Sequence, residues 1–173
     1  GERGGRADHR GRTPAAAGRG RAPAAAVTAG RALHVVLPGD VADPASPSGG
    51  NVYDRRLCRG LSAAGWRVRE VAVPGAWPQP EPAARRALAR ELAALPDGAD
   101  VLLDGLVACG VPEVVVPHAR RLRLVVLVHL PLAAETGTPA PVAARLEARE
   151  RETLRAASAV VATSPWAARE VTR

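Results

Sequence analysis

The feature that most constrains the fold is an alternation, from Ala32 onward, of short apolar runs with segments of helical periodicity. The run at 124–128 is apolar at every position, which suits a central strand of a parallel sheet covered on both faces. Strands separated by helices predict an α/β domain with a doubly wound, mainly parallel five-stranded sheet. The predicted strands are residues 33–37, 66–73, 101–103, 124–128 and 158–163.

The helices are predicted from capping residues and from apolar spacing. Asn51 can cap a first helix, with Asp54 in its first turn, and Gly65 is placed to stop it. The dense charge after Pro141 indicates a solvated helix face. The apolar face of the first helix is predicted to consist of Tyr53, Leu57, Leu61 and Ala64. Further helices are expected from Pro82, over 112–121 with a break at Pro117, from Pro141 and from Ser164–Pro165.

The net charge of +7 is concentrated at one end of the chain. Residues 1–31 contain seven Arg and two acidic residues, whereas residues 32–173 contain 17 Arg and 15 acidic residues. The segment 1–31 is rich in Gly, Arg, Ala and Pro, and we predict that it is disordered because it has little apolar surface to bury. The folded domain is expected over 32–173, and no nucleic-acid partner is expected for this nearly neutral part.

Missing residue types exclude several kinds of chemistry. The chain has no Lys, which excludes Schiff-base and P-loop lysines, and its two Cys cannot form a four-cysteine zinc site. Ile, Phe and Met are also absent, which indicates a high-GC bacterial genome. Without an initiator Met, and with a last helix cut off at Arg173, the chain is expected to be a fragment of a longer reading frame. No secretory signal or bilayer-spanning run is seen, so a cytoplasmic location is expected.

Candidate site residues follow the predicted strands, because ligands of open α/β sheets bind outside the carboxyl ends of the strands. Gly49 and Gly50 precede a helix whose amino terminus favours an anion such as a phosphate, although Ser-Gly-Gly is also ordinary loop sequence. His129 ends the most apolar strand and can donate to a sugar hydroxyl or transfer a proton; the alternative is a structural histidine bonded to a neighbouring loop. Asp104 and Ser164 also follow strands.

Five segments together resemble the amino-terminal half of a GT-B-fold glycosyltransferase of the retaining family 4 type. They are residues 33–39, 48–57, 104–106, 128–132 and 162–166. The resemblance implies a Rossmann-like domain that mainly binds the acceptor in sugar transfer from a nucleotide-sugar donor, with no metal or other cofactor. It also implies a partner, the second Rossmann-like domain that holds the nucleotide, which is absent here. The implied site consists of His129 as the catalytic residue and of Gly49, Gly50, Asn51, Asp104 and Ser164 as binding residues.

Two other functions stay open at this point. A flavodoxin-like or receiver-like binding module fits the same alternation, and Asp40 and Asp43 follow the first strand as a receiver requires, but the Lys of a receiver is absent. A nucleic-acid binder would instead use the Arg-rich segment 1–31, whose Arg-Gly pairs are typical of RNA-binding tails.

Overall fold

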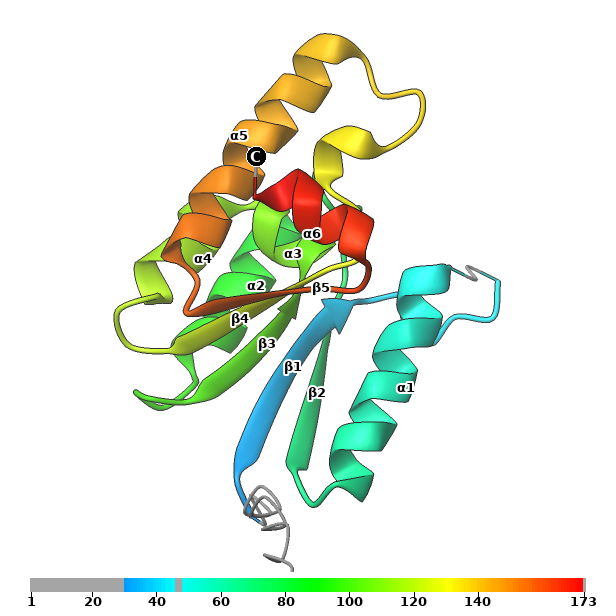
Figure 1. Cartoon of the computed structure of the whole chain (residues 1–173). Coiled ribbons are helices and arrows are strands. Elements are labelled where there is room, and N and C mark those ends of the chain that lie inside the picture. Colours follow the sequence, from blue (N-terminus) through cyan, green and yellow to red (C-terminus); the bar gives the residue numbers. More distant parts are fainter. Residues whose placement is uncertain (1–29, 46–47, 173) are drawn as a thin grey trace, which may run out of the picture.

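A computed structural model describes residues 30–45 and 48–172 and contains one five-stranded, all-parallel sheet (Figure 1). The predicted α/β class is therefore confirmed, and the domain is Rossmann-like. Apart from Gly30 and Arg31, the predicted tail lies outside the described residues. The strands are β1 (Ala32–Pro38), β2 (Arg67–Val73), β3 (Asp100–Asp104), β4 (Arg123–Val128) and β5 (Ala159–Ala162), in the order β2-β1-β3-β4-β5.

The strand order reverses at β1, which has β2 on one side and β3 on the other. Leu33 aligns with Val68 of β2 and with Asp100 of β3. Such a reversal opens a crevice outside the carboxyl ends of the two central strands, because the helices that follow them cover opposite faces of the sheet. This edge of the sheet is where a ligand site is expected.

Helices cover both faces of the sheet (Figure 1). One face packs against α1 (Gly49–Ala63), mainly through Cys58, Leu57 and Leu61. The other face packs against several helices and is the larger core. These helices are α2 (Pro82–Ala93), α3 (Gly105–Gly110), α4 (Pro112–Val115) and α5 (Ala140–Ala156). Two 3-10 turns, η1 (Val116–His118) and η2 (Leu132–Ala134), and the last helix α6 (Pro165–Val171) complete the described part.

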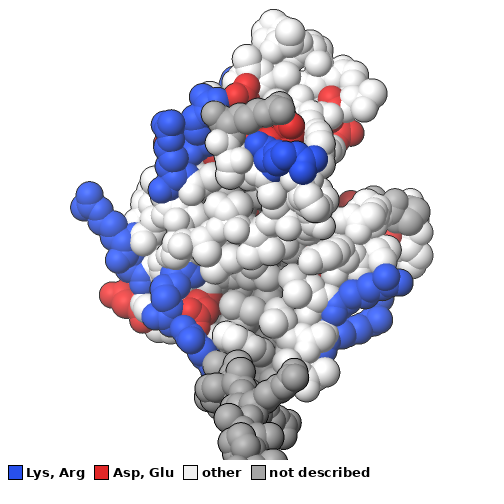
Figure 2. Space-filling view, in the orientation of Figure 1, with Lys and Arg blue, Asp and Glu red and all other residues white. Residues whose placement is uncertain are grey.

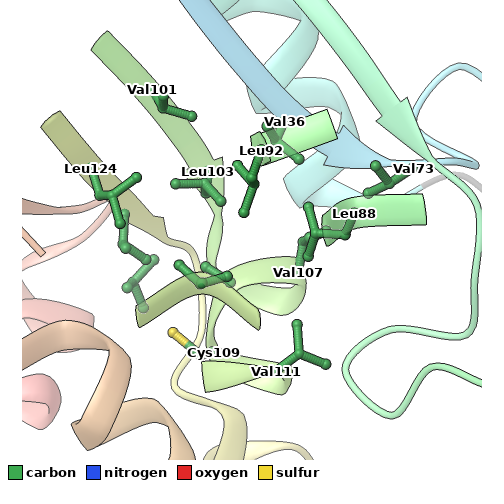
Figure 3. Packing of buried hydrophobic residues seen from close by; sticks show 14 of the residues in the cluster. Val36, Val73, Leu88, Leu92, Val101, Leu103, Val107, Cys109, Val111 and Leu124 are labelled. Carbon is green, nitrogen blue, oxygen red and sulfur yellow. The ribbon is translucent and has the colours of Figure 1, made fainter. Parts of the chain in front are cut away.

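The larger core consists almost entirely of Val, Leu and Ala (Figure 3). Leu103 of β3 and Val126 of β4 point to this face and are fully buried, as is Leu88 of α2. Burial of each such side chain contributes about 1.5–3 kcal/mol. β3 and β4 also contribute Leu102 and Leu127 to the core under α1, so both faces of the central strands are covered, as predicted for the apolar run.

The predicted start of the first helix is wrong, and its predicted apolar face is confirmed only for Leu57 and Leu61. Ser48, not Asn51, is the cap: its Oγ accepts the Asn51 N–H at 3.0 Å, so the helix begins at Gly49. The side chains buried in α1 are Asp54 and Cys58, while Tyr53 is exposed. Leu57 and Leu61 of the predicted stripe still pack on the sheet, so the buried face is rotated toward Asp54 and Cys58 by less than one residue step. The rotation brings a carboxylate into the interior.

Two other features differ from the sequence-based expectations, and a third agrees with them. The short helix α3 directly after β3 was not predicted, because six residues are too few to show helical periodicity. The segment expected to form a helix over 112–121 is α4 followed by the 3-10 turn η1, which contains Pro117, so the expected break is present. On α5 the charged face is not wholly solvated: Glu150 is buried, and its Oε1 accepts the Leu132 N–H at 3.3 Å.

The surface of the described part is uneven in charge. Figure 2 shows charged side chains around the margins of one view and a largely uncharged area over β4 and β5. Val160 and Val161 of β5 and Trp166 of α6 are exposed apolar side chains. No helix among the described residues is both long and apolar enough to cross a membrane.

Candidate functional site

Three ionisable side chains from three elements meet at the carboxyl edge of the sheet. Asp54 comes from α1, Asp104 is the last residue of β3, and His129 directly follows β4. Nε2 of His129 lies 2.8 Å from Oδ1 of Asp54 and 3.5 Å from Oδ2 of Asp104. Because an ionised carboxylate can only accept, Nε2–H donates to Asp54. We call this group the Asp-His-Asp cluster.

The ring of His129 packs against the first two turns of α1. The ring of Tyr53 meets it edge to face, with centroids 5.3 Å apart and an interplanar angle of 74°. On Gly50, a methyl group would lie 3.3 Å from Cδ2 and 3.7 Å from Nε2 of His129. The edge of the ring that contains Cδ2 and Nε2 therefore faces α1. Nδ1 lies on the side of the ring away from this contact.

The two carboxylates are almost completely buried. The Asp54 side chain is 1% exposed and the Asp104 side chain 3%, whereas His129 keeps 20% of its side chain accessible. Asp104 Oδ1 accepts the Leu106 N–H at 2.7 Å and so caps α3. Among the described residues, the buried Oδ2 of Asp54 has no hydrogen-bond partner. An isolated buried carboxylate oxygen is costly, so the cluster must hold a proton or another group there.

Burial and charge together shift the pKa values of the cluster. Burial is the largest cause that raises the pKa of Asp104, to about 7, and the negative charge of Asp54 adds to it. For His129, burial lowers the pKa, but the hydrogen bond to Asp54 and the charges of Asp54 and Asp104 outweigh burial and raise it overall. The shifts therefore favour the protonated forms of both His129 and Asp104.

The structure brings together three of the six residues predicted to form the site. Gly50, Asp104 and His129 lie in or against the cluster. Gly49 lies beside it in the first turn of α1, and a methyl group on it would meet no atom of the described residues within 4 Å. The part of the chain that the structure describes leaves the space in front of this glycine open, as an approaching ligand requires.

The other two predicted residues have local roles. The Asn51 side chain reaches back to the loop after β1, where its Nδ2 donates to the Asp40 carbonyl oxygen at 3.4 Å. Ser164 caps α6, and its Oγ accepts the Ala167 N–H at 3.1 Å. Ala162 pairs with Val128, so Ser164 is at the same edge of the sheet as His129. Its hydroxyl is used for capping.

Sequence reasoning did not identify Asp54 as a site residue. Its spacing was a usable signal: Gly50, Asp54 and Cys58 are four residues apart and therefore share one face of a helix. That face includes the glycine already predicted to lie in the site.

The cluster has two chemical capacities. The imidazole can donate a hydrogen bond or a proton from Nδ1 while Asp54 holds Nε2. In addition, ligand atoms of Asp54, Asp104 and His129 lie within 4.8 Å of one another, close enough for a single cation to reach all three. In the present arrangement Asp54 and His129 are bonded directly to each other.

Comparisons of the chain with protein-family models, with curated proteins and with solved structures found no match.

Proposed function

We propose that this chain is the acceptor-side domain of a retaining glycosyltransferase of the GT-B type, which transfers a sugar from a nucleotide-sugar donor to an acceptor. The proposal rests on the sequence resemblance together with the position of the site. In open α/β sheets, ligands bind at the carboxyl edge where the strand order reverses. The Asp-His-Asp cluster lies at that edge, between the ends of β3 and β4 and the amino end of α1.

One observation carries the proposal. The two most specific points of the resemblance, the Gly-Gly entry to a helix and the histidine after the fourth strand, are 79 positions apart in the sequence at Gly50 and His129. In the fold they are in contact, since a methyl group on Gly50 would lie 3.3 Å from the His129 ring. A helix amino terminus and an imidazole at one place suit a substrate that carries both phosphate and hydroxyl groups.

The proposed roles follow from this arrangement. The first turn of α1, with open space at Gly49, faces the donor phosphates, and His129 lies beside the sugar during transfer. Retaining transfer also needs positive charge at the departing diphosphate, because negative charge develops there. In the proposal, that charge comes from the nucleotide-binding domain. The 173 residues alone are then expected to bind ligand without turnover.

The sheet order favours a second candidate, a flavodoxin-like or receiver-like module. The order β2-β1-β3-β4-β5 is the one that such modules use. A receiver, however, needs an accessible acceptor carboxylate after its third strand. Here Asp104 occupies that place, is 3% exposed and is engaged as the cap of α3. The buried carboxylate makes the phosphoryl-accepting function the weaker of the two.

The test uses NMR spectra of the histidine rings in the 173-residue chain. Nucleotide sugars, polyols and lipid-linked acceptors are titrated separately, and His129→Gln identifies the His129 signals. His118→Gln is the matched control, because His118 precedes β4 and lies at the opposite edge of the sheet. A response of His129 to an acceptor, lost in His129→Gln alone, supports the proposal. Sugar transfer by this chain without a second domain would refute the half-enzyme model, and saturable flavin binding or labelling by acetyl phosphate would favour the alternative.

A further inference from the structure

The buried oxygen of Asp54 needs an explanation that the proposed function does not supply. Asp54 Oδ1 is bonded to His129, but Oδ2 is buried with no hydrogen-bond partner among the described residues. Leaving a buried polar atom unpaired costs about 1–3 kcal/mol, and more for a charged group. The oxygen must therefore accept a hydrogen bond from a proton whose position the non-hydrogen atoms alone do not define.

Asp104 is the group placed to satisfy it. The carboxylates of Asp54 and Asp104 both approach Nε2 of His129, at 2.8 and 3.5 Å. Asp104 Oδ1 is already engaged with the Leu106 N–H, so Oδ2 is the oxygen that can carry a proton. Burial, the charge of Asp54 and a hydrogen bond to Asp54 all raise the pKa of Asp104. A neutral Asp104 can donate its O–H to Asp54, as one member of a carboxyl pair does when two acids share a site.

We propose that Asp54 and Asp104 are positioning residues that share one proton and hold the His129 ring through Nε2, so that Nδ1 is presented to the substrate. The identity of the substrate rests on the proposed function, whereas the hydrogen bonds that fix the His129 ring do not depend on it. Asp54 accepts hydrogen bonds from both partners, while Asp104 carries the proton. Gly50 and Tyr53 restrict the ring from the side of α1.

The arrangement has a functional consequence. A ring bound at Nε2 by an ionised carboxylate keeps one tautomer and one orientation, so Nδ1 need not be reoriented when a ligand binds. The two aspartates reach the ring from different elements, α1 and the end of β3. A shift between these elements would be transmitted to Nδ1 even though neither carboxylate touches the substrate.

The experiment measures the tautomer and the titration midpoint of His129 in the 173-residue chain by ¹⁵N NMR. Asp54→Asn keeps the size of the side chain but removes its charge, so the His129 midpoint moves to lower pH. In Asp104→Asn, the amide can donate to Asp54 as the neutral carboxyl does, so the ring stays protonated at Nε2. Glu91→Gln, an exposed acid on α2, is the matched control and leaves both quantities unchanged.

Three results would overturn the proposal. An unchanged His129 midpoint in Asp54→Asn would show that Asp54 does not hold the ring. Loss of the Nε2–H tautomer in Asp104→Asn would show that Asp104 does not act as a donor. Saturable binding of Zn²⁺ or Mn²⁺ that displaces the Nε2 proton and is abolished in Asp54→Asn would identify a cation site instead. None of these measurements involves a sugar, so the proposed glycosyl transfer can fail while this inference stands, and the reverse is equally possible.

Discussion

The contact between Gly50 and His129 gives the sharpest prediction, because Gly49 provides a matched control in the same helical turn. Within a helix, Ala is favoured over Gly by roughly 0.5–1 kcal/mol, so both substitutions gain stability from the backbone. On Gly49 the new methyl group meets nothing within 4 Å. Gly49→Ala is therefore expected to raise the free energy of unfolding by up to about 1 kcal/mol.

Gly50→Ala gives the same gain in stability from the backbone, but its methyl group is too close to the ring of His129. Its methyl group would lie 3.3 Å from Cδ2, 3.6 Å from Cγ and 3.7 Å from Nε2 of His129, so the ring must move by a few tenths of an ångström. That movement lengthens the 2.8 Å bond to Asp54. A hydrogen bond to a charged group contributes about 1.5–3 kcal/mol, so losing half of it cancels the backbone gain. The two variants are expected to differ by about 0.75–1.5 kcal/mol in unfolding free energy, which is half of that hydrogen-bond energy.

Urea denaturation of both variants measures this difference, and the His129 ring signals report the displacement. The same substitution in the His129→Ala background is the control, since removing the ring removes the atoms nearest to the Gly50 methyl group and the gain should return. Equal stabilisation by Gly49→Ala and Gly50→Ala, with an unshifted His129 signal in both, would refute the reasoning.

Three further predictions concern stability and turnover. Gly110→Ala places a methyl group 2.2 Å from the carbonyl oxygen of Pro78 and should cost about 2–3 kcal/mol, whereas Gly60→Ala, with open space around it, should be neutral or stabilising; thermal melts of the pair decide the point. Because the pKa of Asp104 is raised to about 7, the folded chain binds that proton more tightly than the unfolded chain. The stability contributed by this proton is complete below about pH 4 and is lost as the pH rises to 7, by up to about 1.4 kcal/mol per pH unit. Asn cannot titrate, so the unfolding free energy of Asp104→Asn relative to the unsubstituted chain should increase with pH in chemical denaturation across this range. A relative unfolding free energy that stays constant with pH would contradict the raised pKa of Asp104. In an enzyme completed with a nucleotide-binding domain, His129→Ala should lower kcat and kcat/KM together by roughly one to three orders of magnitude, while a loss of melting temperature alone would mark a structural histidine.

The order of elements and the edge that carries the site could be predicted from the sequence. Short apolar runs separated by helical segments leave few arrangements other than a parallel sheet, because each crossover needs a helix. In a parallel sheet, all residues that directly follow strands lie at one edge. The positions of Asp104 and His129 at that edge follow from this rule, and the cap at Ser164 follows from a Ser that precedes a Pro at a helix start.

The composition of the site was decided by the tertiary structure. Hydropathy assigns the buried face of a helix to its apolar side chains, yet in α1 the residues that turn inward include Asp54. This carboxylate is buried because its partner, His129, lies 75 residues further along the chain, and the sheet brings the two together. The same holds for Glu150, which is buried against the backbone of Leu132. Charged side chains are buried only when distant parts of the chain provide hydrogen bonds and neutralising charge. A local sequence pattern cannot predict these partners, because they are far apart in the sequence.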